Sequence, residues 1–260
     1  MPRALSGGQT LPLSQMDASA FIGISETSID LAKANRSGAC TMFQNKTMVP
    51  LFPTTLWTFQ IPADIFSRIN MELRNKLDQL IAAAPDKNSR GGFLQTAHDL
   101  HTLPEMQELN GYFMNAVNDV IGILSTKQKD VEITGCWANI HPSDSSHKAH
   151  SHPNNFLSAV YYVTAPPGGR EITFWDPRIQ HYIMTPEFEK SNAHNTEHLT
   201  VEVEEGMLLL FPSWLVHSVP GSASNERRIS ISFNINFTDF TGQVSPPRWE
   251  ANVPTHPRTS

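Results

Sequence analysis

The sequence is poor in cysteine and has no long hydrophobic run. Its 260 residues include only two cysteines, Cys40 and Cys136, which lie far apart and form no CxxC pair. A disulfide framework is therefore not expected, and a reducing, cytoplasmic location is the default. No apolar stretch reaches the roughly eighteen residues of a membrane span. Residues 1–8 also lack the apolar segment of a secretory signal.

Positive charge is scarce as well. The chain has 19 Lys and Arg residues against 25 Asp and Glu residues, which gives a net charge of −6 with neutral histidines. A nucleic-acid surface would require clustered basic residues, so no nucleic-acid partner is expected. The length fits one large domain with a sizeable core. The sequence is silent on assembly, for which a homodimer is only the common default.

The chain divides into three parts by its hydrophobic patterning. Residues 1–47 show weak periodicity and are interpreted as an N-terminal extension of unassigned role. Residues 48–240 contain the predicted elements of the main domain, and residues 241–260 form an irregular tail with four prolines. Apolar residues at helical spacing predict helices over about 63–84 and 104–125, whose apolar stripes should pack on a sheet.

The remaining elements of the main domain are predicted to be strands. One strand is expected within residues 51–61, before the first helix, because its second half is β-branched and aromatic. After the second helix, short apolar segments separated by Gly, Pro and Asn predict strands at 131–140, 156–164, 170–175, 199–204, 207–211 and 228–238. Two helices followed by a run of strands indicate a mainly β, α+β domain, with the strands in a sandwich or barrel.

Histidines cluster in one short segment. Three of the eleven histidines, His147, His150 and His152, fall within six residues. Side chains two apart on an extended chain share a face, so His150 and His152 can reach one metal ion, while Pro153 ends the strand. His147 is interpreted as a supporting or surface residue.

A third ligand is expected from a distant strand. His217 follows the apolar segment 207–211 and is the best candidate, although a lone histidine there would more often be a core residue. His181, His194 and His198 lie in a polar segment and are expected to be solvated. Nitrogen ligands suit Zn, Fe, Ni or Cu, and spacing alone does not choose among them.

The segment 228–235 alternates cleanly between polar and apolar residues. Arg228, Ser230, Ser232 and Asn234 share one face, and the other face is apolar. In a barrel a polar inner face could hold an anion near the metal, and Arg is suited to grip a carboxylate with two parallel hydrogen bonds. Tyr161 or Tyr162 could supply a hydroxyl to the same anion, although both are more often core aromatics.

The order of these motifs resembles the 2-oxoglutarate and Fe(II)-dependent oxygenase superfamily, and in particular a bacterial and phage branch. The resemblance covers roughly residues 48–240 and rests on segments 51–54, 137–140, 150–154, 157–163, 176–178, 210–214 with His217, and 228–234. It implies a double-stranded β-helix, or jelly-roll, fold around one Fe(II) ion.

The resemblance also implies the roles of individual residues. His150 and His217 match iron ligands, and Arg228 matches the basic residue that pairs with the far carboxylate of 2-oxoglutarate. Tyr162 matches a tyrosine that bonds the same carboxylate, while Trp137 and Asn139 match positions that line the pocket. Ser230 follows on the polar face beside Arg228.

Position 152 departs from the usual pattern of the superfamily. His152 stands where most members have an Asp or Glu ligand, so three neutral imidazoles would leave the site one unit more positive. Three facial ligands still leave three positions for a bidentate oxoacid and O2. Asp176 is an alternative source of a carboxylate, ranked below His152 because Asp176-Pro177-Arg178 is typical of a turn at a strand end.

The expected function is therefore an oxygenase that oxidises a small organic substrate and decarboxylates 2-oxoglutarate to succinate. Two alternatives remain open at this point. One is a three-histidine, cupin-type dioxygenase that uses no oxoacid, which His152 favours and Arg228 and Tyr162 disfavour. The other is a non-catalytic barrel that binds a small ligand. The pocket walls carry no recognisable code for the substrate.

Overall fold

A computed structural model describes residues 51–84, 92–178, 186–190, 192, 194–241 and 253–255, and the backbone of three short strands before them. The strands are β1 (Thr10–Leu11), β2 (Ile29–Asp30), β3 (Thr47–Met48), β4 (Trp57–Gln60), β5 (Leu94–Gln95), β6 (Val131–His141), β7 (His147–His150), β8 (Leu157–Thr164), β9 (Glu171–Trp175), β10 (His198–Glu202), β11 (Met207–Pro212), β12 (His217–Val219) and β13 (Arg228–Phe237). The α-helices are α1 (Ala63–Ala83), α2 (Gln107–Ile123) and α3 (Thr238–Thr241), with 3₁₀ turns at Leu100–Thr102 and Pro104–Met106.

Two sheets form the body of the protein. The larger sheet has the order β4-β11-β8-β13-β6-β5, and its neighbouring strands run antiparallel. The smaller sheet has the order β1-β10-β9-β12-β7 and is antiparallel apart from the β1–β10 pair. Strands that are neighbours in sequence, such as β11 and β12, lie in different sheets. This arrangement is a double-stranded β-helix, as predicted.

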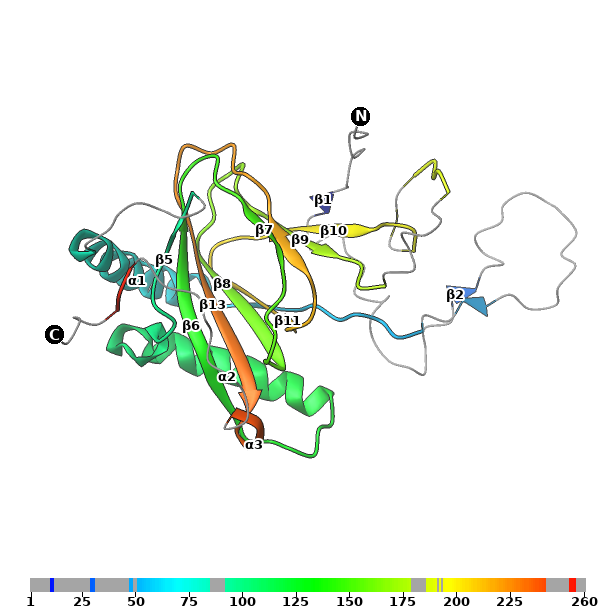
Figure 1. Ribbon diagram of the computed structural model, residues 1–260, viewed down its shortest axis with the longest axis horizontal. Coiled ribbons are helices and arrows are strands. Elements are labelled where there is room, and N and C mark those ends of the chain that lie inside the picture. Colours follow the sequence, from blue (N-terminus) through cyan, green and yellow to red (C-terminus); the bar gives the residue numbers. More distant parts are fainter. Residues whose placement is uncertain are drawn as a thin grey trace, which may run out of the picture.

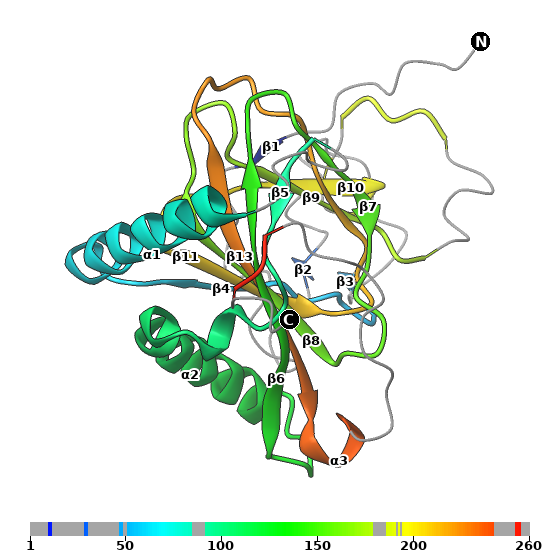
Figure 2. The same cartoon turned by 60° about the vertical axis from the view of Figure 1, so that its left-hand side comes forward.

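The helices cover the outer face of the larger sheet. Figures 1 and 2 show α1 and α2 on one side of β6, β8 and β13, and the smaller sheet on the other side. The apolar stripe of α2 packs on this outer face, where the Phe113 and Phe233 rings stack 4.0 Å apart. Each fully buried Leu or Phe side chain contributes about 1.5–3 kcal/mol. The helices thus close one face and leave the inner face to the site.

Strand alternation divides the residues of the larger sheet between these two faces. On β13, Ile229, Ile231 and Phe233 belong to the core under the helices, as their spacing predicts. On β8, Tyr161 points to the helix side, whereas Tyr162 belongs to a second core between the sheets. The polar residues of β13 therefore face the interior of the barrel.

The predicted elements agree with the structure except near the start of the main domain. The strand expected within residues 51–61 covers only Trp57–Gln60. Leu51 and Phe52 are exposed, and Phe52 has a φ of 55°, outside the extended region. Pro53 follows and has no N–H to donate to a ladder. The second helix begins at Gln107, because residues 104–106 form a 3₁₀ turn.

Part of the predicted tail packs on the larger sheet. Val253 is fully buried, donates its N–H to the Gln95 carbonyl at 3.1 Å and accepts one from Ala97 at 2.7 Å. The extension over residues 1–47 lies outside the described residues apart from the backbone of three short strands. Among the helices that the structure describes, none is long and apolar enough to cross a membrane.

Gly206 should be intolerant of substitution. Its φ is +80°, and a Cβ added there would collide with the Phe66 ring of α1. Its backbone also donates to the Tyr162 carbonyl at 2.9 Å and accepts from Ile61 at 3.0 Å. We expect Gly206→Ala to lower the free energy of unfolding by about 1–3 kcal/mol, measured by denaturant titration.

The matched control for this substitution is Gly111→Ala. Gly111 lies on the exposed face of α2, and an added Cβ there meets no atom within 4 Å. Alanine at this helical position should stabilise the protein by about 0.5–1 kcal/mol. Equal effects at both positions would contradict the assigned conformation of Gly206.

Candidate metal centre

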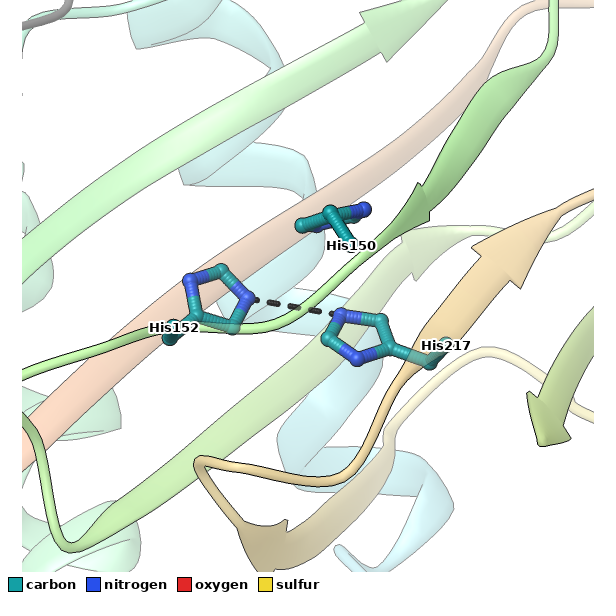
Figure 3. A group of neighbouring side chains, drawn as sticks. All are labelled: His150, His152 and His217. Carbon is teal, nitrogen blue, oxygen red and sulfur yellow. Dashed lines mark hydrogen bonds between the residues drawn. The ribbon is translucent and has the colours of Figure 1, made fainter. Parts of the chain in front are cut away.

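Three histidines on and beside the smaller sheet lie close together. His150 is the last residue of β7, His152 follows two residues later, and His217 is the first residue of β12 (Figure 3). One nitrogen of each ring lies within 4.8 Å of the corresponding nitrogens of the other two. The β7–β12 register, which places His150 opposite His217, produces this proximity across 67 positions of sequence.

Backbone carbonyls orient two of the rings. The Nδ1 atom of His150 lies 2.7 Å from the Lys148 carbonyl oxygen, and that of His217 lies 3.0 Å from the Leu215 carbonyl oxygen. A carbonyl oxygen only accepts, so each Nδ1 carries the proton, and each Nε2 presents a lone pair. The N–H of His152 donates to the Ser213 carbonyl at 2.8 Å, which ties the segment after β7 to the turn before β12.

The spacing between His152 and His217 suits two ligands of one ion. Their Nε2 atoms lie 3.3 Å apart, shown as a dashed line in Figure 3. Two imidazoles that bind one ion at about 2.1 Å and roughly 90° would have their nitrogens about 3 Å apart. The Nδ1 of His217 donates to the Leu215 carbonyl, so its Nε2 accepts the hydrogen bond from His152 Nε2, and a bound cation would take the place of that proton.

The environment keeps these imidazoles neutral. Burial, together with the neighbouring imidazoles, lowers the pKa of His152 to about 3. Burial, together with electrostatic repulsion from the neighbouring His150 ring, lowers the pKa of His217 to about 4. Burial also lowers the pKa of His150. At neutral pH all three rings therefore retain a lone pair for a metal.

The structure brings the three predicted ligands together, although by a different local route. The prediction placed His150 and His152 on one strand, but β7 ends at His150 and His152 lies beyond it. Asp176, the alternative ligand, forms an ion pair with Arg178 at 2.6 Å. Within the described ranges, the group that could hold a metal consists of the three histidines.

The other predicted site residues line the same cavity. Trp137 and Asn139 of β6, Tyr162 of β8, and Arg228 and Ser230 of β13 all face it, together with the three histidines. Tyr162 lies opposite Ser230 in the β8–β13 register. Burial raises the pKa of the Tyr162 phenol, so this side chain keeps its proton as a hydrogen-bond donor.

Among the residues that the structure describes, Arg228 is a buried cation without an anionic partner. Its side chain is among the buried residues with 2% relative exposure. One Nη donates to the Glu171 carbonyl at 3.3 Å, and the buried Nε has no partner. No acidic side chain lines the cavity in the part of the chain that the structure describes. Burial lowers the Arg228 pKa, but a guanidinium remains charged at neutral pH.

Two predictions about neighbouring residues are wrong. Tyr161 was a candidate for the same anion, but its hydroxyl donates to the Asn70 Oδ1 of α1 at 2.7 Å, on the other side of the sheet. His198 was expected to be solvated, but it is half-buried and its ring lies 5.1 Å from that of Trp175. His194 is exposed as expected, and His181 lies outside the described residues.

Sequence patterns missed one residue that supports the cavity wall and one that lines it. Gln95 donates from its amide to Asn139 Oδ1 at 2.8 Å, and Asn139 donates in turn to Ser232 Oγ at 3.0 Å. His141, at the end of β6, also lines the cavity and is the register partner of Arg228 on the neighbouring strand β13. Its Nδ1 atom is hydrogen-bonded to the Ser145 hydroxyl at 3.1 Å. Gln95 lies in a two-residue strand, which carries too few residues for a periodic signal.

Comparison with known proteins agrees with this geometry. A family model described as "Putative 2OG-Fe(II) oxygenase" matches residues 135–234, which run from β6 to β13 and include all three histidines and Arg228. This segment is therefore similar to the 2OG-Fe(II) oxygenases, a class of enzymes. No curated protein sequence matches the chain.

Solved structures with the same fold are similar at low sequence identity. HygX from Streptomyces hygroscopicus, solved with nickel and 2-oxoglutarate, has a TM-score of 0.52 and 14% identity over 72% of this chain and 84% of its own. A Pseudomonas putida prolyl-4-hydroxylase has a TM-score of 0.51 and 15% identity, with coverages of 71% and 93%. The α-ketoglutarate-dependent epimerase SnoN from nogalamycin biosynthesis has the same TM-score and identity, with coverages of 77% and 93%.

Proposed function

We propose that this protein is a 2-oxoglutarate- and Fe(II)-dependent oxygenase that oxidises a small organic substrate. The observation that carries the proposal is the pairing of two features in one cavity. Three neutral imidazoles bring one nitrogen each to a common point, and Arg228 presents a buried positive charge without an acidic partner among the described residues. The three imidazoles fit a metal ion, and a dicarboxylate bound to that ion could also pair with the guanidinium of Arg228.

The donor set fits a divalent iron ion. His150, His152 and His217 would hold it through their Nε2 atoms, and three ligands leave open positions for an oxoacid and O2. Imidazoles alone also suit nickel, copper or zinc. The match of residues 135–234 to the 2OG-Fe(II) oxygenase family, and the iron-bound form of HygX, support iron.

Arg228 would bind the carboxylate of 2-oxoglutarate that lies away from the metal. A guanidinium binds a carboxylate through two parallel hydrogen bonds, and its unpartnered Nε supplies one donor. Tyr162 and Ser230 lie beside each other on the same wall and would add hydroxyl groups. Trp137 and Asn139 would form the remaining wall of the same pocket.

The placement of these groups assigns a role in the reaction to each of them. Iron and 2-oxoglutarate supply oxidising power from O2, with decarboxylation of 2-oxoglutarate to succinate. The histidines fix the position of the metal through their carbonyl-bonded Nδ1 atoms, and Arg228 fixes the orientation of the oxoacid. The apolar residues between the sheets, Phe211 among them, exclude water from the reaction.

Anaerobic absorption spectroscopy tests the proposal. Addition of Fe(II) and 2-oxoglutarate should give a visible metal-to-ligand charge-transfer band, and admission of O2 with a substrate should yield succinate. The absence of the band would rule out the function. Oxygen consumption with substrate but without 2-oxoglutarate would identify the three-histidine dioxygenase instead.

His152 should tolerate a carboxylate but not an apolar residue. Because most of the superfamily has an acidic ligand at this position, we expect His152→Asp to retain bound iron, whereas His152→Ala should lower iron affinity by about tenfold or more. Iron content after anaerobic loading and dialysis measures both. Equal iron retention in His152→Ala and the unaltered protein would remove His152 from the ligand set.

The setting of the enzyme is also proposed from the sequence. We assign residues 48–240 to the oxygenase domain, with residues 1–47 and 241–260 as its extensions. The low cysteine content and the buried free thiol of Cys136 support a cytoplasmic location. The net charge of −6 supports the absence of a nucleic-acid partner.

A further inference from the structure

His147 points into the cavity because of a bulge in β7. Residues three apart on a regular strand point to opposite faces, so His147 and His150 should lie on different sides. Between the pairs His217↔His150 and Val219↔His147, however, β7 has one more residue than β12. The extra residue turns both rings to the same face, where they stack with centroids 4.1 Å apart. Bulges of this kind re-aim side chains beside active sites.

The ring of His147 is held in place, but its nitrogens are not engaged. It lies against His150 on one side and Phe93 on the other, with centroids 4.1 and 4.7 Å away. It is half-buried and lines the same cavity as the three histidines. Unlike His150 and His217, it makes no hydrogen bond to any described residue. A fixed polar group with free hydrogen-bonding capacity in this position is suited to contact a bound molecule.

The charge of the loaded site favours an anionic molecule. Divalent iron with three neutral imidazoles keeps two positive charges, and Arg228 adds a third. 2-Oxoglutarate contributes two negative charges, so one positive charge remains uncompensated. No acidic side chain lines the cavity within the described residues. A buried net charge is costly, and a ligand of opposite charge removes that cost.

We propose that the substrate carries a carboxylate or similar anionic group, and that His147 is a positioning residue that hydrogen-bonds this group beside the metal. This inference rests on the proposed function, because the charge balance assumes bound iron and 2-oxoglutarate. It adds the chemical class of the substrate and a residue that selects it.

Benzoate and benzamide form a matched pair of probes, because they have nearly the same shape and differ in charge. Each is titrated by calorimetry into the anaerobic complex of protein, Fe(II) and saturating 2-oxoglutarate, while the charge-transfer band reports that the complex stays intact. We expect benzoate to bind at least about tenfold more tightly than benzamide. His147→Phe keeps a ring between Phe93 and His150 but removes the nitrogens, and should lower benzoate affinity about tenfold without changing the band.

His147→Gln restores a hydrogen-bonding side chain and should recover part of the benzoate affinity that His147→Phe loses. If His147 only packs against His150, the His147→Phe variant should bind benzoate more tightly than the His147→Gln variant. Equal affinities for the two probes, or unchanged benzoate binding in His147→Phe, would overturn the inference while the band leaves the proposed function intact. Loss of the band on adding benzoate would mean displacement of 2-oxoglutarate and would also contradict it. Failure to form the band at all would overturn the proposed function and this inference together.

Discussion

Alanine in place of His217 should abolish stable iron binding. His217 is the most buried of the three histidines, with 6% relative exposure, and its ring lies near both of the others. Its loss would leave the nitrogens of His150 and His152 as an incomplete set. Because mutation of residues that merely support metal ligands already costs about 10–100-fold, we expect iron affinity to fall by about 100-fold or more. Iron content and succinate formation measure the effect.

His194→Ala is the matched control for this substitution. His194 is exposed and does not belong to the group that could hold a metal within the described ranges. The control should retain full iron content and turnover. Circular dichroism and thermal unfolding should show that the His217→Ala variant is folded, so that lost iron is not a consequence of unfolding. Normal iron content in a folded His217→Ala protein would refute the proposed metal centre.

Arg228→Met should separate binding of 2-oxoglutarate from binding of iron. Methionine fills similar space without charge, and Arg228 is not one of the clustered histidine ligands. Removal of one partner of a buried, hydrogen-bonded charge pair costs about 2–5 kcal/mol, so the Kd for 2-oxoglutarate should rise by about 30-fold or more. Iron binding should be unchanged. Titration of the charge-transfer band with 2-oxoglutarate measures the shift.

The same substitution should not destabilise the protein when 2-oxoglutarate is absent. A buried charge without an acidic partner is costly, and apolar replacements of buried ionic groups are often neutral or stabilising by about 1–4 kcal/mol. Added 2-oxoglutarate and iron should raise the Tm of the unaltered protein through mass action and should have a smaller effect on the variant. Marked destabilisation of the ligand-free variant would indicate that Arg228 is a structural residue.

Arg227→Met provides the control for charge at the neighbouring position. Arg227 is exposed and pairs with Asp78 at 3.0 Å on the outside of the protein. Exposed ion pairs contribute about 0–1 kcal/mol, so this variant should match the unaltered protein in Tm and in 2-oxoglutarate affinity. If Arg227→Met and Arg228→Met lowered 2-oxoglutarate affinity equally, the lower affinity would not come from a contact inside the cavity.

The long elements were predictable from the sequence because their patterns repeat many times. The helix over 63–84 and the strands from 131 onward present enough turns or alternations to fix both type and buried face. The short strand β7 has only four residues and β12 only three, so neither has a repeat that a pattern could detect. Position-specific backbone features, such as the positive φ of Phe52, also leave no periodic trace.

The sequence by itself singled out the residues to which we assign the chemistry: a tight group of histidines, one more after an apolar strand, and an arginine that begins an alternating strand. The tertiary structure alone decided how they meet. Strand register sets His217 opposite His150, a bulge turns His147 into the same cavity, and sheet faces separate Tyr162 from Tyr161. The physical reason is that register and bulges depend on hydrogen bonds between strands that are distant in sequence. Residue type and local alternation, in contrast, can be read from the amino-acid sequence alone.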